Sequence, residues 1–580
     1  MKRAIALLIL IIFALAAGAQ SLQQRIFLEK NMVLLKNKQS LLPLLHLDTL
    51  RISIKADSSI FFPFYNAFWR YAPTVKDEVN LTVYPVAPGH IPSIFNHPNI
   101  IIIFDTTLNL IDTLSPLADV LLLMPGHDSL AQDYAVQLLF GAIAAQGTLP
   151  DSTQLYPQNS GLRTASGLRL KYTVPAELGL DSVFIFSQID SIVNNAIRQH
   201  AFPGCQILAA RDGKVFFYRS YGYLTYDSLL PVTMNHIYDL ASITKIAASA
   251  PCLMLLYDKE LLDLHQPLAH YLPWLRWSNK RKILLIDALT HQARLWSWIP
   301  FWTHTLNRRG KLKKKYFSSD SSNKYPYPVA CNLYASKKTI RLVHRLIKKS
   351  KLLPVKQYRY SDLSFYLYPE LVERLTGEDF RTCLKKNFYK PLGAWRMDFR
   401  PYEFYPQHLI VPTEQDSVFR GQLVWGYVHD EGAAMIGGIS GHAGLFANVD
   451  DLAKLMQMYL NYGYYGNRRY LSDTTLRRWT SYQFASTGNR RGLVFDKPML
   501  THPERGTPSP LASPQSFGHS GFTGTFAWAD PQTGLIFIFL SNRVYPTRKN
   551  RNLLRLNVRT NIHNVLYQAI LNAEQDETNN

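Results

Sequence analysis

The stretch YDLASITKIA, residues 238–247, decides the fold of this chain, and an apolar run follows it as far as Leu256. Positions three apart lie on one face of a helix, so the Ser242 hydroxyl and the Lys245 ammonium are expected side by side. A serine hydroxyl is a poor nucleophile until a neighbouring group takes its proton. A lysine that is partly desolvated at the start of a buried helix can lose its charge and take that proton. Because Ser-x-x-Lys also occurs by chance, its meaning depends on the residues that accompany it.

Two further segments carry polar side chains that a nucleophile could use. Residues 360–362, Tyr-Ser-Asp, directly precede an amphipathic helical pattern that ends near Gly377. Residues 518–528, GHSGFTGTFAW, are expected to form a hairpin with the apolar run 535–540. Glycines on the inner strand of such a hairpin allow a substrate to approach the backbone closely. The three segments together predict a catalytic cleft.

In this order the segments resemble the serine β-lactamase and penicillin-binding-protein fold, in particular class C-like members with their D-alanyl carboxypeptidase and esterase relatives. The resemblance extends over residues 181–575, because a helical pattern at 181–199 and an Asp-Gly hairpin at 204–218 precede the nucleophile. It implies an α/β (α+β) domain that combines an antiparallel sheet with an all-helical subdomain. The same fold supports several reactions, so it does not fix the substrate.

The resemblance also implies catalytic roles. Ser242 is expected to be the nucleophile, and Lys245 and Tyr360 are expected to manage its proton. His519 would assist catalysis by polarising Tyr360 or by binding a carboxylate of the substrate. The backbone N–H groups of Ser242 and Phe522 would form an oxyanion hole.

The substrate-binding residues implied by the resemblance are Asp362, Ser520, Gly521 and Phe522. Gly521 would keep side-chain atoms out of the cleft. Asp362 stands where the family carries an asparagine, and a carboxylate cannot donate the hydrogen bond that an amide gives to the substrate. Asp362 could instead pair with Lys245, sense a cationic group, or share with the preceding serine the capping of the following helix.

Residues 24–150 alternate between strand-like and helical patterns, which predicts a small α/β sandwich domain. The runs 99–105 and 119–124 suit strands covered on both faces, and residues 129–145 suit a helix. Segments 31–44 and 137–150 resemble the opening and closing parts of the second, α/β domain of family 3 glycoside hydrolases. Their nucleophilic aspartate lies on a preceding barrel, for which no room is expected here. Residues 20–155 are therefore expected to be a remnant, joined by a linker at 156–180.

The N-terminus has the pattern of a secretory signal peptide, residues 1–19. Met1-Lys2-Arg3 precedes an apolar run from Ala4 to Ala17, followed by a small-residue cleavage site at Ala19. The run is short for a membrane anchor, which needs about 20 residues. We expect an exported protein, periplasmic or extracellular, that starts near Gln20.

The formal net charge of +21 is strongly basic. Nucleic acid is the usual partner of such a chain, but in an exported protein anionic envelope polymers or membrane surfaces fit better. A basic cluster at 308–315 lies in a long insert, 296–335, whose position in the family order suggests a flap near the cleft mouth. The alternative for the cluster is a solvated loop.

No cofactor or metal is expected. The four cysteines (Cys205, Cys252, Cys331 and Cys383) have no metal-ligand spacing, and a disulfide stays open. His429 and His442 could suggest a metal site, but the dense glycines around them favour tight packing beside the cleft.

These observations predict an exported serine hydrolase that acts through an acyl-enzyme on an amide or ester. A cell-wall peptide or another D-amino-acid derivative is the expected substrate, because export and basic charge both suit an anionic envelope polymer. Alternatives are a β-lactamase or a carboxylesterase. A catalytically silent protein that binds cell-wall fragments is the alternative from another class.

Overall fold

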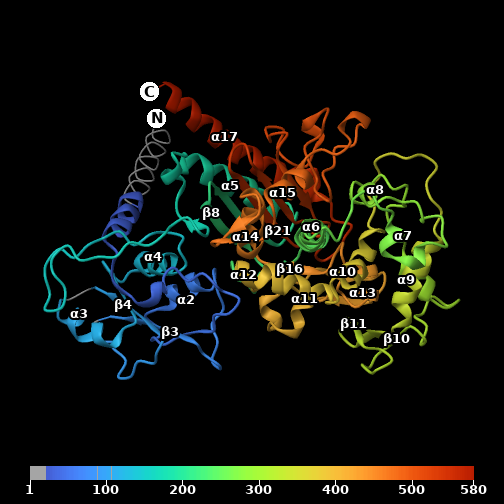
Figure 1. Cartoon of the computed structure of the whole chain (residues 1–580). Helices are drawn as coiled ribbons and strands as arrows, with labels where there is room; N and C mark the ends of the chain where they lie inside the picture. Colours follow the sequence, from blue (N-terminus) through green and yellow to red (C-terminus); the bar gives the residue numbers. More distant parts are fainter. Residues whose placement is uncertain (1–20, 88, 106–107, 580) are drawn as a thin grey trace.

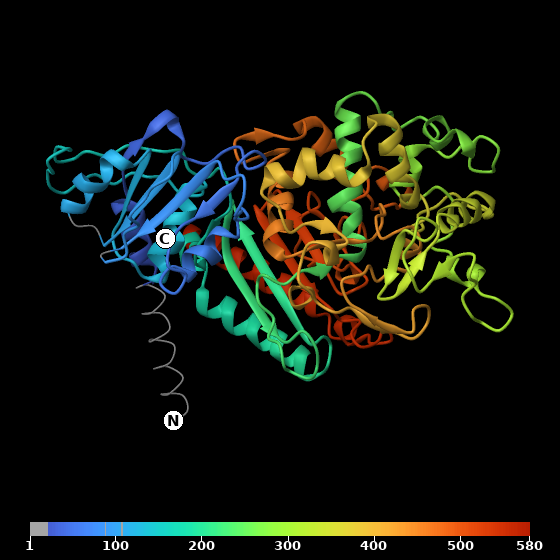
Figure 2. The same cartoon turned by 90° about the horizontal axis from the view of Figure 1, so that it is seen from below.

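The computed structural model describes residues 21–87, 89–105 and 108–579, so the predicted signal peptide at 1–19 lies outside the described residues. Two units lie side by side, a smaller N-terminal one and a larger one that holds most of the chain (Figures 1 and 2). Among the helices described, none combines the length and the apolar character that crossing a membrane requires.

The N-terminal unit is built on a five-stranded sheet in the order β1-β5-β4-β3-β2. Strands β2 to β5 are parallel, and β1 pairs antiparallel to β5. Helices α2 and α4 cover one face and α3 the other, so apolar side chains predominate on both faces of the strands. The strands are β1 (Val33–Asn37), β2 (Ile52–Ile54), β3 (Leu81–Val86), β4 (Asn99–Phe104) and β5 (Val120–Met124), and the helices are α2 (Phe62–Phe68), α3 (Leu108–Leu114) and α4 (Ser129–Leu139).

The predicted strands at 99–105 and 119–124 are confirmed as β4 and β5. The predicted helix at 129–145 is too long, because α4 ends at Leu139. Gly141 then adopts a φ of +69°, in the left-handed region that stops a helix, and it packs against Pro43. The chain turns away at that point.

The larger unit contains a six-stranded sheet in the order β19-β20-β21-β7-β8-β6. All neighbours pair antiparallel except β6 and β8. Helices α5 and α17 pack on one face, and α14 packs on the other. The strands are β6 (Lys171–Tyr172), β7 (Gly204–Arg211), β8 (Lys214–Gly222), β19 (Phe517–Ser520), β20 (Phe526–Asp530) and β21 (Leu535–Ser541), and the helices are α5 (Ser182–Arg198), α14 (Val449–Leu460) and α17 (Val558–Asn579). This sheet with its helices confirms the predicted fold class.

Strand β6 comes from the segment 156–180 that the sequence suggested as a linker. The side-chain amide of Gln137, on α4, forms two hydrogen bonds with the backbone of Tyr172: it donates to the carbonyl oxygen and accepts from the N–H. The Tyr172 hydroxyl donates to Asp450 at 2.6 Å, and Tyr218 donates to the same carboxylate at 2.7 Å. One continuous core of buried residues extends through both units.

The remaining elements of the larger unit form a mainly helical subdomain around α6. Helices α10, α11 and α15 contact α6, and small sheets lie at the edge. The helices are α6 (Ala250–Asp258), α7 (Leu268–Tyr271), α8 (Leu285–Leu289), α9 (Lys338–Lys349), α10 (Tyr368–Thr376), α11 (Phe380–Leu384), α12 (Lys390–Leu392), α13 (Glu431–Met435), α15 (Asp473–Thr480) and α16 (Asn552–Arg555). The strands are β9 (Tyr238–Asp239), β10 (Phe317–Ser318), β11 (Tyr327–Ala330), β12 (Leu333–Ala335), β13 (Asp398–Phe399), β14 (Glu414–Asp416), β15 (Gln422–Val424), β16 (Leu445–Ala447), β17 (Tyr464–Tyr465) and β18 (Arg468–Arg469).

Candidate active site

Ser242 lies on a 3₁₀ turn, Ala241–Ile243, between β9 and the buried helix α6. A π-helical turn, Lys245–Ser249, joins the 3₁₀ turn to α6, so the predicted helix begins irregularly. Ala241 has a φ of +47°, which is uncommon for a residue with a side chain. Thr523 and Thr525 hold the turn, because their hydroxyls donate to the carbonyl oxygens just before it at 2.8 and 2.9 Å.

Lys245 is buried and contacts three oxygen atoms. Its Nζ donates to Ser242 Oγ at 3.0 Å and to the His442 carbonyl at 3.3 Å, and it forms an ion pair with Asp362 Oδ1 at 2.7 Å. Burial alone lowers the pKa of Lys245, but Asp362 and Tyr360 outweigh burial and raise that pKa above its usual value. Lys245 is therefore charged at neutral pH, contrary to the expectation that burial would remove its charge.

Tyr360 is the second donor to the nucleophile, since its hydroxyl donates to Ser242 Oγ at 2.9 Å. Burial raises the pKa of Tyr360, and the Lys245 ammonium offsets only part of that rise. The ring lies 4.6 Å, between centroids, from the buried ring of His291. His291 Nδ1 also accepts a hydrogen bond from the Ser361 N–H at 3.1 Å, which fixes the loop that carries Tyr360. No specific signal in the sequence pointed to this role of His291.

Asp362 pairs with Lys245, which is one of the alternatives that the sequence left open. The helix-capping alternative is wrong, because no side chain caps the N-terminus of α10 or of the 3₁₀ turn before it. The backbone N–H of Asp362 donates to the Ser297 carbonyl at 2.9 Å, so the start of the 296–335 insert supports this loop.

His519 lies close to Tyr360, with 5.9 Å between ring centroids, but forms no hydrogen bond with it. Its Nδ1 donates to the Ser520 carbonyl at 2.8 Å, which leaves Nε2 as a buried acceptor without a partner among the described residues. Burial, and then the charge of Arg491, lower the pKa of His519 to about 3. The ring is neutral at pH 7, so it cannot attract a carboxylate as a cation.

A glycine is needed at position 521 for a different reason from the predicted one. A Cβ added there would collide with Thr525 Oγ1 and the Leu240 carbonyl oxygen, which belong to the packing of the strand against the nucleophile turn. The missing side chain therefore lets β19 approach the turn, and it does not clear the cleft.

Ser242, Ser520 and Phe522 all line the same cavity. Neither the Ser242 N–H nor the Phe522 N–H has a protein acceptor within the part of the chain that the structure describes. The Phe522 ring is half-exposed and stacks on His429 with 5.6 Å between centroids. Two free backbone donors beside a serine hydroxyl suit an oxyanion.

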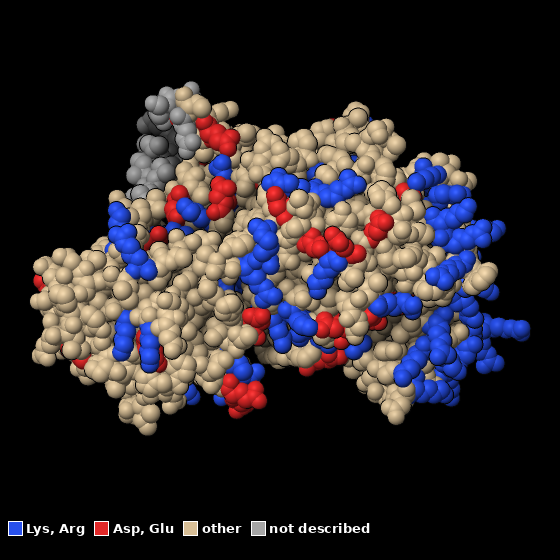
Figure 3. Space-filling view, in the orientation of Figure 1, with Lys and Arg blue, Asp and Glu red and all other residues tan. Residues whose placement is uncertain are grey.

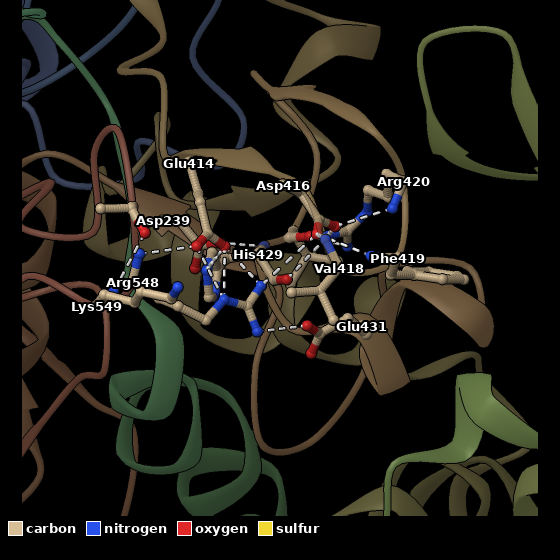
Figure 4. A network of polar contacts seen from close by, with 12 residues as sticks. Asp239, Glu414, Asp416, Val418, Phe419, Arg420, His429, Glu431, Arg548 and Lys549 are labelled. Atoms are coloured by element: carbon tan, nitrogen blue, oxygen red, sulfur yellow. Dashed lines mark hydrogen bonds and ion pairs between the residues drawn. The ribbon is translucent and has the colours of Figure 1, made fainter. Parts of the chain in front are cut away.

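A network of polar contacts around His429 and Arg548, which line the cavity, supports its wall (Figure 4). Arg548 Nε donates to Glu414 at 2.9 Å, and His429 Nε2 lies 2.8 Å from the same carboxylate. The backbone N–H of His429 donates to the Asp239 carboxylate, on the strand before the nucleophile, at 2.7 Å. Burial would raise the pKa of Glu414, but His429 and Arg548 outweigh it and lower that pKa to about 2.

The second histidine that the sequence singled out is also paired with a carboxylate. His442 Nε2 lies 3.0 Å from Asp430 Oδ1, and His429 is held by Glu414. In the described part of the chain, no group of three or more histidine, cysteine or carboxylate side chains is arranged to bind a metal ion.

The cavity beside Ser242 has a volume of about 740 Å³ and a wall that the sequence did not reveal. Arg543, Arg551 and Arg559 line it, and none of the three has a carboxylate within ion-pair distance among the described residues. Burial, and then Arg551, lower the pKa of Arg543 to about 10, so its charge persists at pH 7. Arg543 lies 4.6 Å from the centre of the Phe522 ring. These arginines follow the last motif along the chain, where nothing in the sequence marks them.

The profile of the family described as Beta-lactamase matches residues 189–560. A protein named "Putative D-alanyl-D-alanine carboxypeptidase" from Salmonella enteritidis PT4 is 30% identical over 398 residues, which cover 64% of this chain and 85% of that protein. A protein of the same name from Salmonella typhimurium LT2 matches with the same identity and coverage.

Solved structures with weaker similarity include a penicillin-binding protein homologue from Caulobacter crescentus. It is 17% identical with a TM-score of 0.48, and the match covers 66% of this chain and 97% of that one. A class C β-lactamase is 16% identical with a TM-score of 0.46, covering 65% of this chain and 97% of that one.

Proposed function

The chain belongs to the beta-lactamase family of serine hydrolases, and we propose that it is an exported hydrolase of D-alanyl carboxypeptidase or esterase type. Its substrate would be a cell-wall peptide or a related D-amino-acid amide or ester. The observation that carries this proposal is the hydroxyl of Ser242, which accepts hydrogen bonds from Lys245 at 3.0 Å and Tyr360 at 2.9 Å.

The Lys245–Tyr360 pair first loses one proton to solvent. Ser242 Oγ then attacks the carbonyl carbon of the substrate, and the serine proton passes to the vacant position on the pair. The oxyanion that forms would be stabilised by the N–H groups of Ser242 and Phe522. The bond to the leaving amine or alcohol then breaks, and the pair returns the proton to that group. Water attacks the acyl-enzyme, releases the acid and restores the serine.

The cavity wall supports an anionic substrate. Arg548 is neutralised by Glu414 and Glu431, whereas Arg543 and Arg551 have no such partner among the described residues. Guanidinium groups bind carboxylates through paired hydrogen bonds, so these side chains suit the terminal carboxylate of a peptide. The carboxylate of Asp362, in place of an amide, disfavours β-lactam recognition.

We also propose that the N-terminal unit, residues 20–155, is a non-catalytic remnant of the family 3 glycoside hydrolase α/β domain. Support comes from its mainly parallel sheet with helices on both faces. Glycosidase chemistry ordinarily needs two carboxylates that flank the sugar, and neither resembling segment supplies such a pair.

Covalent labelling tests the proposed nucleophile. A fluorophosphonate probe should label the wild type and should not label Ser242→Ala. A fluorescent penicillin, used in parallel, tests whether a β-lactam also acylates Ser242. If neither probe labels the wild type, the silent cell-wall binder is favoured.

A substrate panel then separates the enzymatic options. A D-Ala-D-Ala peptide should turn over with a higher kcat/KM than nitrocefin, and Ser242→Ala should lose both activities. Faster hydrolysis of nitrocefin would contradict the peptide assignment, and activity on p-nitrophenyl acetate alone would favour a carboxylesterase.

A further inference from the structure

The positive charge of the chain is concentrated in one continuous segment, residues 276–359, here called the basic lobe. This segment contains 21 Lys and Arg against two Asp, so it carries a net charge of +19 out of +21 for the whole chain. Figure 3 shows these side chains gathered over the part of the molecule that holds α7, α9 and β10, with few acidic side chains among them. The rest of the chain is close to neutral.

The cations of the basic lobe lack acidic partners. All of residues 276–359 are described, and among their Lys and Arg side chains only Lys356 forms an ion pair, with Asp287 at 2.8 Å. On α9, Leu342, Val343 and Ile347 are buried, while Arg341, Arg345 and Lys349 follow one another at four-residue intervals and are exposed. Like charges at this spacing repel each other and destabilise a helix. The arrangement therefore costs folding stability that an anionic partner would recover.

An exposed tryptophan lies within this surface. Trp277 is 88% exposed and stands beside Arg276, Arg281 and Lys282, which are also exposed. Its loop is tied to the end of α9, because Lys280 Nζ donates to the Ser350 carbonyl at 2.6 Å. The loop that presents the indole is therefore anchored among the cations of the lobe.

A hollow beside that loop is also basic. It has a volume of about 640 Å³, and its lining includes Arg281, Lys282, Arg294 and Lys356. Val355, next to Lys356, is 59% exposed. The basic lobe thus combines cations, a basic hollow and exposed apolar side chains, among them Trp277 and Val355.

We propose that the basic lobe docks on the surface of an anionic lipid bilayer, with Trp277 at the level of the headgroups. Lys and Arg side chains attract anionic lipids, and tryptophan favours the interface between membrane and water. A soluble anionic polymer would use the cations but would not require the exposed Trp277 and Val355, so the bilayer is favoured. The proposal does not depend on the proposed hydrolase activity.

The basic lobe also borders the active-site cavity. The residues Trp298 to Trp302, which begin the insert within the basic lobe, line the cavity next to Ser242. The segment proposed to dock on the bilayer therefore also supplies part of the active-site wall.

Vesicle co-sedimentation of the full chain tests the proposal. The lobe variant replaces Arg281, Lys282, Lys349 and Lys351 with Gln. The matched control replaces four exposed cations outside the basic lobe, Lys30, Lys55, Lys76 and Arg163, with Gln. Wild type and control should bind vesicles that contain phosphatidylglycerol, and they should bind pure phosphatidylcholine weakly. The lobe variant should bind the anionic vesicles about tenfold more weakly or worse. All three proteins share one N-terminus, so any contribution from it cancels.

Two further measurements separate the bilayer from other partners. Trp277→Ala should weaken binding to the anionic vesicles and leave retention on soluble dextran sulfate unchanged. Equal binding by the lobe variant and its control would overturn the proposal, and so would tight retention on dextran sulfate without vesicle binding. Far-UV circular dichroism and thermal unfolding should be equal in all variants, which confirms folding and keeps this test independent of the catalytic one.

Discussion

At the scale of single residues, Asp362 controls the charge of the groups that contact Ser242. Its carboxylate raises the pKa of Lys245, against the effect of burial, and adds to the rise that burial causes in the pKa of Tyr360. Both groups therefore hold their protons at neutral pH. Because one proton must leave the pair before Ser242 can attack, activity should rise as the pH increases.

Asp362→Asn should shift the acidic limb of the pH profile of kcat/KM to lower pH by about one unit or more, since removing the negative charge lowers the pKa of both neighbours. The measurement is hydrolysis of p-nitrophenyl acetate across the pH range. Asp362→Glu keeps the charge and should keep the limb near its wild-type position. An unchanged profile for the asparagine variant would show that the pair does not limit the reaction.

Arg551 should contribute to substrate selection without affecting the chemical step. It lines the cavity, is exposed, and carries no ion pair among the described residues. Arg551→Gln should lower kcat/KM for a D-Ala-D-Ala peptide about 10- to 100-fold, because a charged hydrogen bond contributes roughly 1.5–3 kcal/mol. Turnover of the neutral p-nitrophenyl acetate should be unchanged. Arg555→Gln, four residues further on and outside the cavity, is the matched control, and an equal loss in both variants would contradict this role.

At the scale of elements, strand β19 and the nucleophile turn are packed without room for a side chain. Gly521 on the strand side meets the Leu240 carbonyl and Thr525, and the threonine hydroxyls hold the turn. The distance between the two proposed oxyanion donors depends on this contact. An element that moved by a fraction of an ångström would misplace one donor.

Gly521→Ala should reduce acylation of Ser242 by about 100-fold, since displacing one oxyanion donor typically costs 10²–10³ in rate. The global fold should survive at a cost of roughly 1–3 kcal/mol for the extra methyl group. Fluorophosphonate labelling rates and thermal unfolding measure the two effects separately. Gly506→Ala, where an added Cβ meets atoms no closer than 3.2 Å, should leave labelling unchanged. Normal labelling of the Gly521 variant would refute the close-packing argument.

At the scale of the whole molecule, the network around Glu414 joins β9, β14 and the loop after β21. The pKa of Glu414 is about 2 in the folded chain, below its usual value of 4.5. A depressed pKa means that the charged form contributes stability above about pH 4.5. This contribution is lost as the pH falls from there towards 2.

Thermal unfolding should therefore show a Tm that declines as the pH is lowered from 5 to 3, because protonation of Glu414 removes its charged contacts with His429 and Arg548. Glu414→Gln should lower the Tm at pH 7, because Arg548 loses its charged partner, and should flatten the decline. Asp181→Asn, which removes a carboxylate at an exposed helix cap, serves as the comparison. A Glu414 variant with the wild-type pH dependence would contradict the assignment.

The sequence predicted the fold class, and the three-residue spacing placed Lys245 beside Ser242, because short motifs encode local geometry. Tyr360, 118 residues from Ser242, was assigned to the site only through the resemblance to a known family. The sequence left the partner of Asp362 open, since an ion pair across more than a hundred residues depends on the tertiary fold. It assigned the wrong reason to Gly521, because a sequence does not show what an added Cβ would meet. Arg543 and Arg551 went unrecognised, because single arginines beyond the last motif carry no pattern.

Strand β6 limits how far this chain could be shortened from its N-terminus. It is contributed by the segment that connects the two units, and it covers the edge of β8. A shortened descendant that began at residue 181 would leave that edge open, and an uncovered strand edge recruits other chains. It would also leave Asp450 without the Tyr172 hydroxyl. The connecting segment through Tyr172 is thus part of the fold of the larger unit, and a truncation past it should lower stability and increase self-association.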